Sequence, residues 1–118
     1  MKTSSLFDNL EFNESKPLVT VLFETNFTKE IRIAMAKGTV MKEHKTSFPI
    51  VVQMVEGNVD FGVEQKNLEL VKGDILALDS NVPHDLKAIE DSVIRLTLTK
   101  NDSSERVEGV ALKAIKTL

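Results

Sequence analysis

Short strand-like runs follow one another through most of this 118-residue chain, and no long helical pattern interrupts them. Each run is rich in β-branched and aromatic residues, and turn residues recur roughly every 8–12 positions. The runs that predict strands are 18–23, 30–37, 49–55, 59–63, 68–71, 75–78, 84–89 and 92–98. Together with the segment around His44 they make about nine short strands, which is typical of an all-β sandwich or barrel.

Two tight turns predict which of these runs pair with each other. Glu56-Gly57-Asn58 separates the runs 49–55 and 59–63. Gly and Asn readily adopt the left-handed backbone of a hairpin turn. The same reasoning applies to Gly73, which stands between the next two runs. We therefore expect two β-hairpins in this part of the chain.

Length and composition set bounds on the domain organisation. A chain of 118 residues, 42% of them hydrophobic, is long enough for one domain with a core of its own. We expect a single domain over 1–118, with a barrel core over 31–98, an N-terminal arm and first strand over 1–30 and a C-terminal tail over 99–118. Apolar residues at helical spacing from 107 to 118 predict a short terminal helix.

Charge and residue content exclude several classes of function. The net charge is −3, and no cluster of Lys and Arg lies on a predicted face, so nucleic acid is not an expected partner. Cysteine is absent, which excludes disulfides, thiolate metal sites and a cysteine nucleophile. Neither a signal peptide nor an apolar run of about 20 residues is found, so we expect a cytoplasmic protein with no membrane partner.

The chain has only two histidines, and each lies in a segment that begins with a glycine. Gly38 precedes His44 with five residues between them, and Gly57 follows at the next turn. Gly73 precedes the second histidine, His84, which directly follows a Val-Pro pair. Two motifs of this kind resemble those of the cupin superfamily, in particular its small single-domain members of the cupin 2 or RmlC-like type. The resemblance covers the barrel core and implies a jelly-roll β-barrel of antiparallel strands, also called a double-stranded β-helix.

The chain departs from the cupin motifs at the positions that bind metal. A full cupin holds one divalent ion, often iron, manganese, nickel or zinc, with three histidines and one glutamate. Here Thr46 stands where the second histidine belongs, and Ile50 stands where the glutamate belongs. The resemblance therefore implies a degenerate site, with His44 and His84 as the candidate ligands for Zn, Ni, Fe or Mn.

A ligand pocket is expected around the two histidines. Residues two apart on a strand share one face, so an unbroken strand through His44 would carry the next residues of the same phase into the barrel. The expected pocket residues are His44, Thr46, Ile50, Val52, Met54, His84 and Leu86. Such a pocket suits a compact, largely hydrophobic small molecule with one polar group. Alternatively, each histidine only bonds a carbonyl at the barrel mouth and has a structural role.

These observations leave more than one function open. Two imidazoles without a carboxylate fill only two of the positions that a divalent ion prefers, which favours a small-ligand-binding protein over a catalyst. The alternative is a metal-dependent enzyme, an oxygenase or isomerase of a small organic molecule, in which water or substrate completes the metal shell. A third interpretation is metal-free acid–base chemistry by one imidazole. No catalytic residue is assigned.

Two predicted strands, 18–23 and 50–55, have apolar residues on both faces, apart from Gln53. In a two-sheet sandwich one face of a strand meets water and is polar. Either the N-terminal arm or a second subunit must therefore cover these strands. Since small cupins commonly pair through a sheet face, the resemblance and the pattern together predict a homodimer.

Overall fold

The computed structural model describes residues 1–100, and it folds this range into nine β-strands without a helix. No membrane-spanning helix is therefore present among these residues. The terminal helix expected within 107–118 lies outside the described residues. The strands are β1 (Leu18–Glu24), β2 (Thr28–Met35), β3 (Val40–His44), β4 (Ile50–Glu56), β5 (Asn58–Val63), β6 (Lys66–Val71), β7 (Ile75–Leu78), β8 (His84–Ala88) and β9 (Ser92–Thr99).

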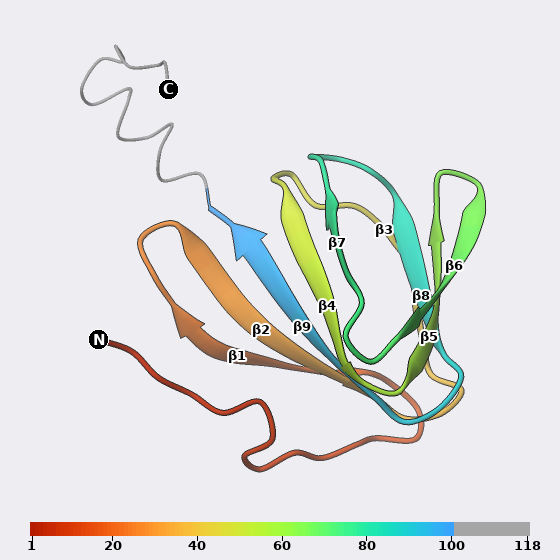
Figure 1. Ribbon diagram of the computed structural model, residues 1–118, viewed down its shortest axis with the longest axis horizontal. Helices are drawn as coiled ribbons and strands as arrows, with labels where there is room; N and C mark the ends of the chain where they lie inside the picture. Colours follow the sequence, from red (N-terminus) through yellow and green to blue (C-terminus); the bar gives the residue numbers. More distant parts are fainter. Residues whose placement is uncertain (101–118) are drawn as a thin grey trace.

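The strands form two antiparallel sheets, which confirms the expected all-β class. One sheet has five strands in the order β1-β2-β9-β4-β7, and the other has four in the order β3-β8-β5-β6. Figure 1 shows the two sheets facing each other, with the N-terminal arm running beside the β1–β2 hairpin. Because neighbours in each sheet are mostly distant in sequence, the chain crosses repeatedly between the two layers.

The two hairpins expected around Gly57 and Gly73 are wrong, although the turns themselves are present. Gly57 joins β4 of one sheet to β5 of the other, and Gly73 joins β6 to β7 in the same way. Both glycines have left-handed backbones, with φ of 98° and 95°. Turn chemistry therefore located the chain reversals correctly. It did not distinguish a hairpin from a crossing between sheets.

A hairpin that the sequence did not indicate joins β5 to β6, which are register neighbours. Its two turn residues, Glu64 and Gln65, have φ of 53° and 64°. These are the left-handed values of the turn type that matches the twist of two paired strands. Gly, Asn and Asp normally mark such a turn, and none of them occupies either position, so the sequence carries no signal for it.

The hydrophobic core lies between the two sheets. Alternate residues of a strand point to the same side, so the register of β2, β9 and β4 aligns one continuous inner layer. Val52, for example, lies opposite Leu96, and Met54 lies opposite Ile94. The buried apolar residues of the core are Ile31, Ile33, Met35, Ile50, Val52, Met54, Val59, Phe61, Leu70, Leu86, Ala88 and Ile94.

The N-terminal arm, residues 1–17, crosses the outer face of the β1–β2 hairpin. Nη1 of Arg32 in β2 donates hydrogen bonds to the backbone oxygens of Leu6 and Asp8, at 3.1 and 2.9 Å. Nearer its start, the arm is held by Nζ of Lys2, which donates to the backbone oxygen of Glu24 at the end of β1. The arm thus runs back along the hairpin from its turn toward its open end.

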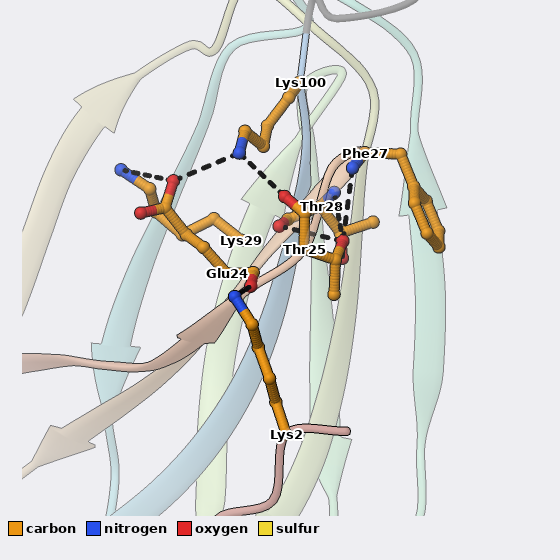
Figure 2. Close-up of polar contacts among 7 residues, drawn as sticks. All are labelled: Lys2, Glu24, Thr25, Phe27, Thr28, Lys29 and Lys100. Carbon is orange, nitrogen blue, oxygen red and sulfur yellow. Dashed lines mark hydrogen bonds and ion pairs between the residues drawn. The ribbon is translucent and has the colours of Figure 1, made fainter.

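Figure 2 shows the corner where the β1–β2 turn meets the end of β9. The hydroxyl oxygen of Thr25 accepts hydrogen bonds from the backbone N–H groups of Phe27 and Thr28, at 3.2 and 2.8 Å. Nζ of Lys100 donates to the backbone oxygen of Thr25 at 2.8 Å and lies 3.3 Å from the carboxylate of Glu24. Together with the bond from Lys2, these contacts join three segments that are far apart in the sequence.

Candidate functional site

The pairing of β3 with β8 brings the two histidines together. His44 is the last residue of β3, His84 is the first residue of β8, and the two are register partners. Their ring centroids lie 4.3 Å apart with an angle of 60° between the planes. The ring of His84 also stacks on Phe61, with a centroid distance of 5.6 Å. His84 is buried, with 4% of its surface exposed, whereas His44 is half-buried.

Each imidazole is oriented by a backbone oxygen two residues before it. Nδ1 of His44 lies 2.7 Å from the oxygen of Lys42, and Nδ1 of His84 lies 3.0 Å from the oxygen of Val82. A carbonyl oxygen only accepts hydrogen bonds, so Nδ1 carries the proton in both rings. In a neutral ring Nε2 is then an acceptor. Neither Nε2 has a hydrogen-bond partner among residues 1–100.

A small cavity of about 30 Å³ adjoins the two rings. Its lining consists of Ile33, Met41, His44, Val52, Phe61, His84, Leu86, Ile94 and Leu96. Apart from the two imidazoles, every lining side chain is apolar. A water molecule needs roughly 10–15 Å³ of such space, so the cavity holds one or two small groups rather than a whole organic molecule.

Burial lowers the pKa of His84 below its ordinary value, because a charged imidazole loses its hydration inside the barrel. The nearby His44 lowers the pKa further by charge repulsion. The hydrogen bond to Val82 and the carboxylate of Asp85 act in the opposite direction. The net lowering keeps His84 neutral at pH 7, so its Nε2 remains a hydrogen-bond acceptor.

The cavity uses part of the residue set predicted from the sequence. Four of the seven predicted residues line it, namely His44, Val52, His84 and Leu86. Ile50 and Met54 are buried in the core but do not line the cavity. Thr46 lies away from it, because β3 ends before this residue and its hydroxyl donates to the backbone oxygen of Phe48 at 2.9 Å. The expected continuous strand through His44 is therefore wrong, because β3 ends at His44.

Five further residues line the cavity that the sequence did not single out: Ile33, Met41, Phe61, Ile94 and Leu96. They come from β2, β3, β5 and β9, and all are buried or half-buried. Alternation of apolar residues identifies most of them as core positions. It does not show which core positions lie next to the histidines, because that depends on how the two sheets are paired in space.

The residues around the pair do not fit a tightly held divalent metal ion. Two imidazole nitrogens are available as metal ligands. No group of three or more His, Asp or Glu side chains that could hold a metal ion comes together within residues 1–100. The position of the cupin glutamate is taken by Ile50, an apolar core residue. Even a four-coordinate ion would need two further ligands from outside residues 1–100. What the pair offers is two hydrogen-bond acceptors in an apolar wall.

Comparison with known proteins gives a family match over most of the described chain. The family model for an AraC-like ligand binding domain matches residues 28–103. No curated protein matches the sequence.

Several solved structures share the fold. An RmlC-like cupin protein from Desulfovibrio desulfuricans is 18% identical with a TM-score of 0.76, and the match covers 84% of this chain and 96% of that one. The protein TT1209 from Thermus thermophilus is 18% identical with a TM-score of 0.75, covering 84% and 98% of the two chains. KdgF from Halomonas sp. is 22% identical with a TM-score of 0.64, covering 72% and 80%. At these identities the likeness establishes the jelly-roll fold alone.

Proposed function

Because this chain belongs to the family of AraC-like ligand binding domains and has the cupin fold, we propose that it binds a small ligand at the histidine pair. The observation that carries this function is the pair of Nε2 acceptors without a protein donor among residues 1–100, set in an otherwise apolar cavity. Neither Nε2 is among the fully buried unpartnered atoms of residues 1–100, which are Nε of Arg32 and Oδ1 of Asn58, so a donor from outside can reach both. In this proposal a ligand supplies that donor.

The ligand carries a hydroxyl, amine or amide N–H group on a compact apolar body. The neutral Nε2 of His84 is a hydrogen-bond acceptor, and a ligand that donates a hydrogen bond satisfies it. A carboxylate would set acceptor against acceptor and is disfavoured at pH 7. The cavity volume of about 30 Å³ admits only the donor group itself. The body of the ligand then rests on the half-buried Met41 and Leu96, and the flexible Met side chain adapts to its shape.

The two histidines allow a direct test, since no other imidazole contributes a signal. Nuclear magnetic resonance of the ring nitrogens is recorded while small alcohols, phenols and amines are titrated into the full chain. We expect saturable changes at both Nε2 atoms with donor-bearing compounds. His84→Phe should weaken binding by at least about tenfold, because it removes one hydrogen bond to a buried group.

Thr46→Val is the matched control, because Thr46 is a cupin-motif position that lies away from the cavity. This variant should bind as the parent does. Binding would be placed elsewhere if donor-bearing compounds left both ring signals unchanged. The same conclusion would follow if His84→Phe bound them as tightly as the parent.

We also propose that two copies of the chain associate through β1. Among residues 1–100, this edge strand pairs only with β2. Val19 and Val21 are 56% and 51% exposed, although their register partners Ile33 and Ile31 belong to the buried core. An edge strand with exposed apolar side chains is a template for a further strand. The only charge on β1 is that of Glu24 at its end, so antiparallel pairing with a second copy opposes no like charges.

A further inference from the structure

Arg32 is a buried cation whose charge is not balanced by a carboxylate within residues 1–100. Only 5% of its surface is exposed, and none of the ion pairs in this range includes it. Nη1 donates to the two backbone oxygens of the arm, and Nε is buried without a hydrogen-bond partner in the described range. Carbonyl oxygens bear only partial charges. Since buried charges in proteins are normally paired, this guanidinium lacks its counter-charge.

The neighbouring arginine on the same sheet face, unlike Arg32, has a carboxylate that balances its charge. Arg95 of β9 is the register partner of Arg32, and its Nη2 lies 3.2 Å from the carboxylate of Glu30. The same carboxylate oxygen of Glu30 accepts a hydrogen bond from the hydroxyl of Thr97 at 2.6 Å. Glu30 is therefore engaged by β9. This face of the sheet carries two adjacent guanidinium groups and one buried carboxylate.

A cavity adjoins Arg32 between the N-terminal arm and the β1–β2 hairpin. Its volume is about 800 Å³, within the range of roughly 300–1,000 Å³ that is usual for small-molecule sites. Asp8 and Glu11 of the arm line it together with Arg32, and so do the hydroxyl side chains of Ser4 and Thr20. Figure 1 shows the arm running beside the β1–β2 hairpin. The cavity thus has a buried cation, two carboxylates and neutral hydrogen-bonding groups.

We propose that this cavity binds a small zwitterion of the α-amino acid type, with its carboxylate on Arg32 and its ammonium group toward Asp8 and Glu11. Nη1 is engaged by the arm and Nε is fully buried, so Nη2 is the atom of Arg32 that would donate a charge-assisted hydrogen bond to the carboxylate. The acidic side chains would repel a simple anion, and Arg32 would repel a simple amine. A ligand that carries both a carboxylate and an ammonium group is attracted by Arg32 and by the acidic side chains. This site is separate from the cavity at the histidine pair.

Amide nuclear magnetic resonance of the ¹⁵N-labelled full chain tests this site, with each of the twenty common amino acids titrated singly. We expect at least one to produce saturable shifts confined to residues 3–11, 20–22 and the surroundings of Arg32. Each amino acid that binds is then compared with the carboxylate that lacks its amino group and with the amine that lacks its carboxylate. Both should bind at least about tenfold more weakly, since each loses one of the two charge pairs.

Two variants test the positive charge and the negative charges of the cavity separately. Arg32→Met should weaken binding at least about thirtyfold, because it removes the buried cation. Since it also removes the bonds that hold the arm, Glu11→Gln serves as the second variant. That exposed change should weaken amino acid binding about threefold. Glu14→Gln, which lies on the arm but outside the lining, should have no effect.

Several outcomes would overturn the assignment. One is the absence of any saturable shift in the arm and the β1–β2 hairpin with all twenty amino acids. Another is a response confined to the histidine cavity. Equal binding of the deaminated carboxylate, combined with no effect of Glu11→Gln, would exclude a zwitterion as the ligand of this cavity.

Discussion

The burial of His84 makes the stability of the fold depend on pH. In the unfolded chain this imidazole titrates near pH 6.5, whereas in the fold burial lowers its pKa. Between the two values the unfolded chain binds more protons at this position than the folded chain does. The free energy of unfolding therefore decreases as the pH falls through 6.5, and this loss ends below the folded pKa.

We predict that urea denaturation between pH 7.5 and pH 5 will show this loss in the parent and a smaller loss in His84→Phe. Carboxylates of ordinary pKa titrate mostly below pH 5, so they contribute less to the slope than the imidazole does. The variant replaces one buried ring by another of similar size, which keeps the stacking on Phe61. Equal pH slopes in the two proteins would show that burial of the imidazole does not control the effect.

At the same scale, the sequence predicted that the two histidines share a pocket, but not that they lie opposite each other on paired strands. Both stand at recognisable motif positions, and the register of β3 and β8 places them opposite each other. Thr46 stands at a motif position as well, yet β3 ends before it. Where a strand ends depends on hydrogen bonds to distant segments, such as the bond from the backbone N–H of Asn81 to the oxygen of Thr46. Such bonds leave no local pattern in the sequence.

At the scale of the elements, the turns between the sheets differ in how closely they are packed. Gly57 and Gly73 have nearly the same φ, 98° and 95°. A Cβ on Gly57 would collide with the side chain of Ser92 and the backbone of Asp91. A Cβ on Gly73 would meet no atom within 4 Å. The two positions therefore separate the cost of a left-handed backbone from the cost of close packing.

We predict that Gly73→Ala will lower the free energy of unfolding by about 1–2 kcal/mol, the usual cost of a left-handed conformation for a residue with a Cβ. Gly57→Ala should cost about 1–3 kcal/mol more, because the backbone of the adjoining turn must also move. Urea denaturation of both variants measures the difference. Equal losses would mean that the Gly57 turn relaxes without cost and that its close contact with β9 is unimportant.

The strands were easier to predict than their connections. Period-two alternation and turn residues located most strands to within one or two residues, as in β7 (Ile75–Leu78), because both signals are local. The partner of each strand is not local information. The Glu64–Gln65 turn makes a hairpin without a sequence signal, and the Gly57 turn has the signal without making a hairpin.

At the scale of the whole molecule, the exposed edge of β1 determines how copies of the chain would associate. Sedimentation at micromolar concentration should show a dimer for the parent. Val19→Lys should shift it to a monomer, because a charge on the edge strand opposes further pairing. Ile75→Lys is the matched control, since Ile75 is 64% exposed on β7, at the opposite edge of the same sheet. A parent that sediments as a monomer would contradict association through β1.

The two-layer arrangement with long crossings also has a consequence for how the protein is made. Thr28 pairs with Thr99, so β2 acquires its inner neighbour β9 only when almost all of residues 1–100 have been synthesised. The β1–β2 and β5–β6 hairpins can form as the chain emerges, because their strands are adjacent in sequence. The five-stranded sheet must wait for its central strand. A nascent chain that stops before residue 92 therefore exposes the inner faces of β2 and β4 to chaperones and to other unfinished chains.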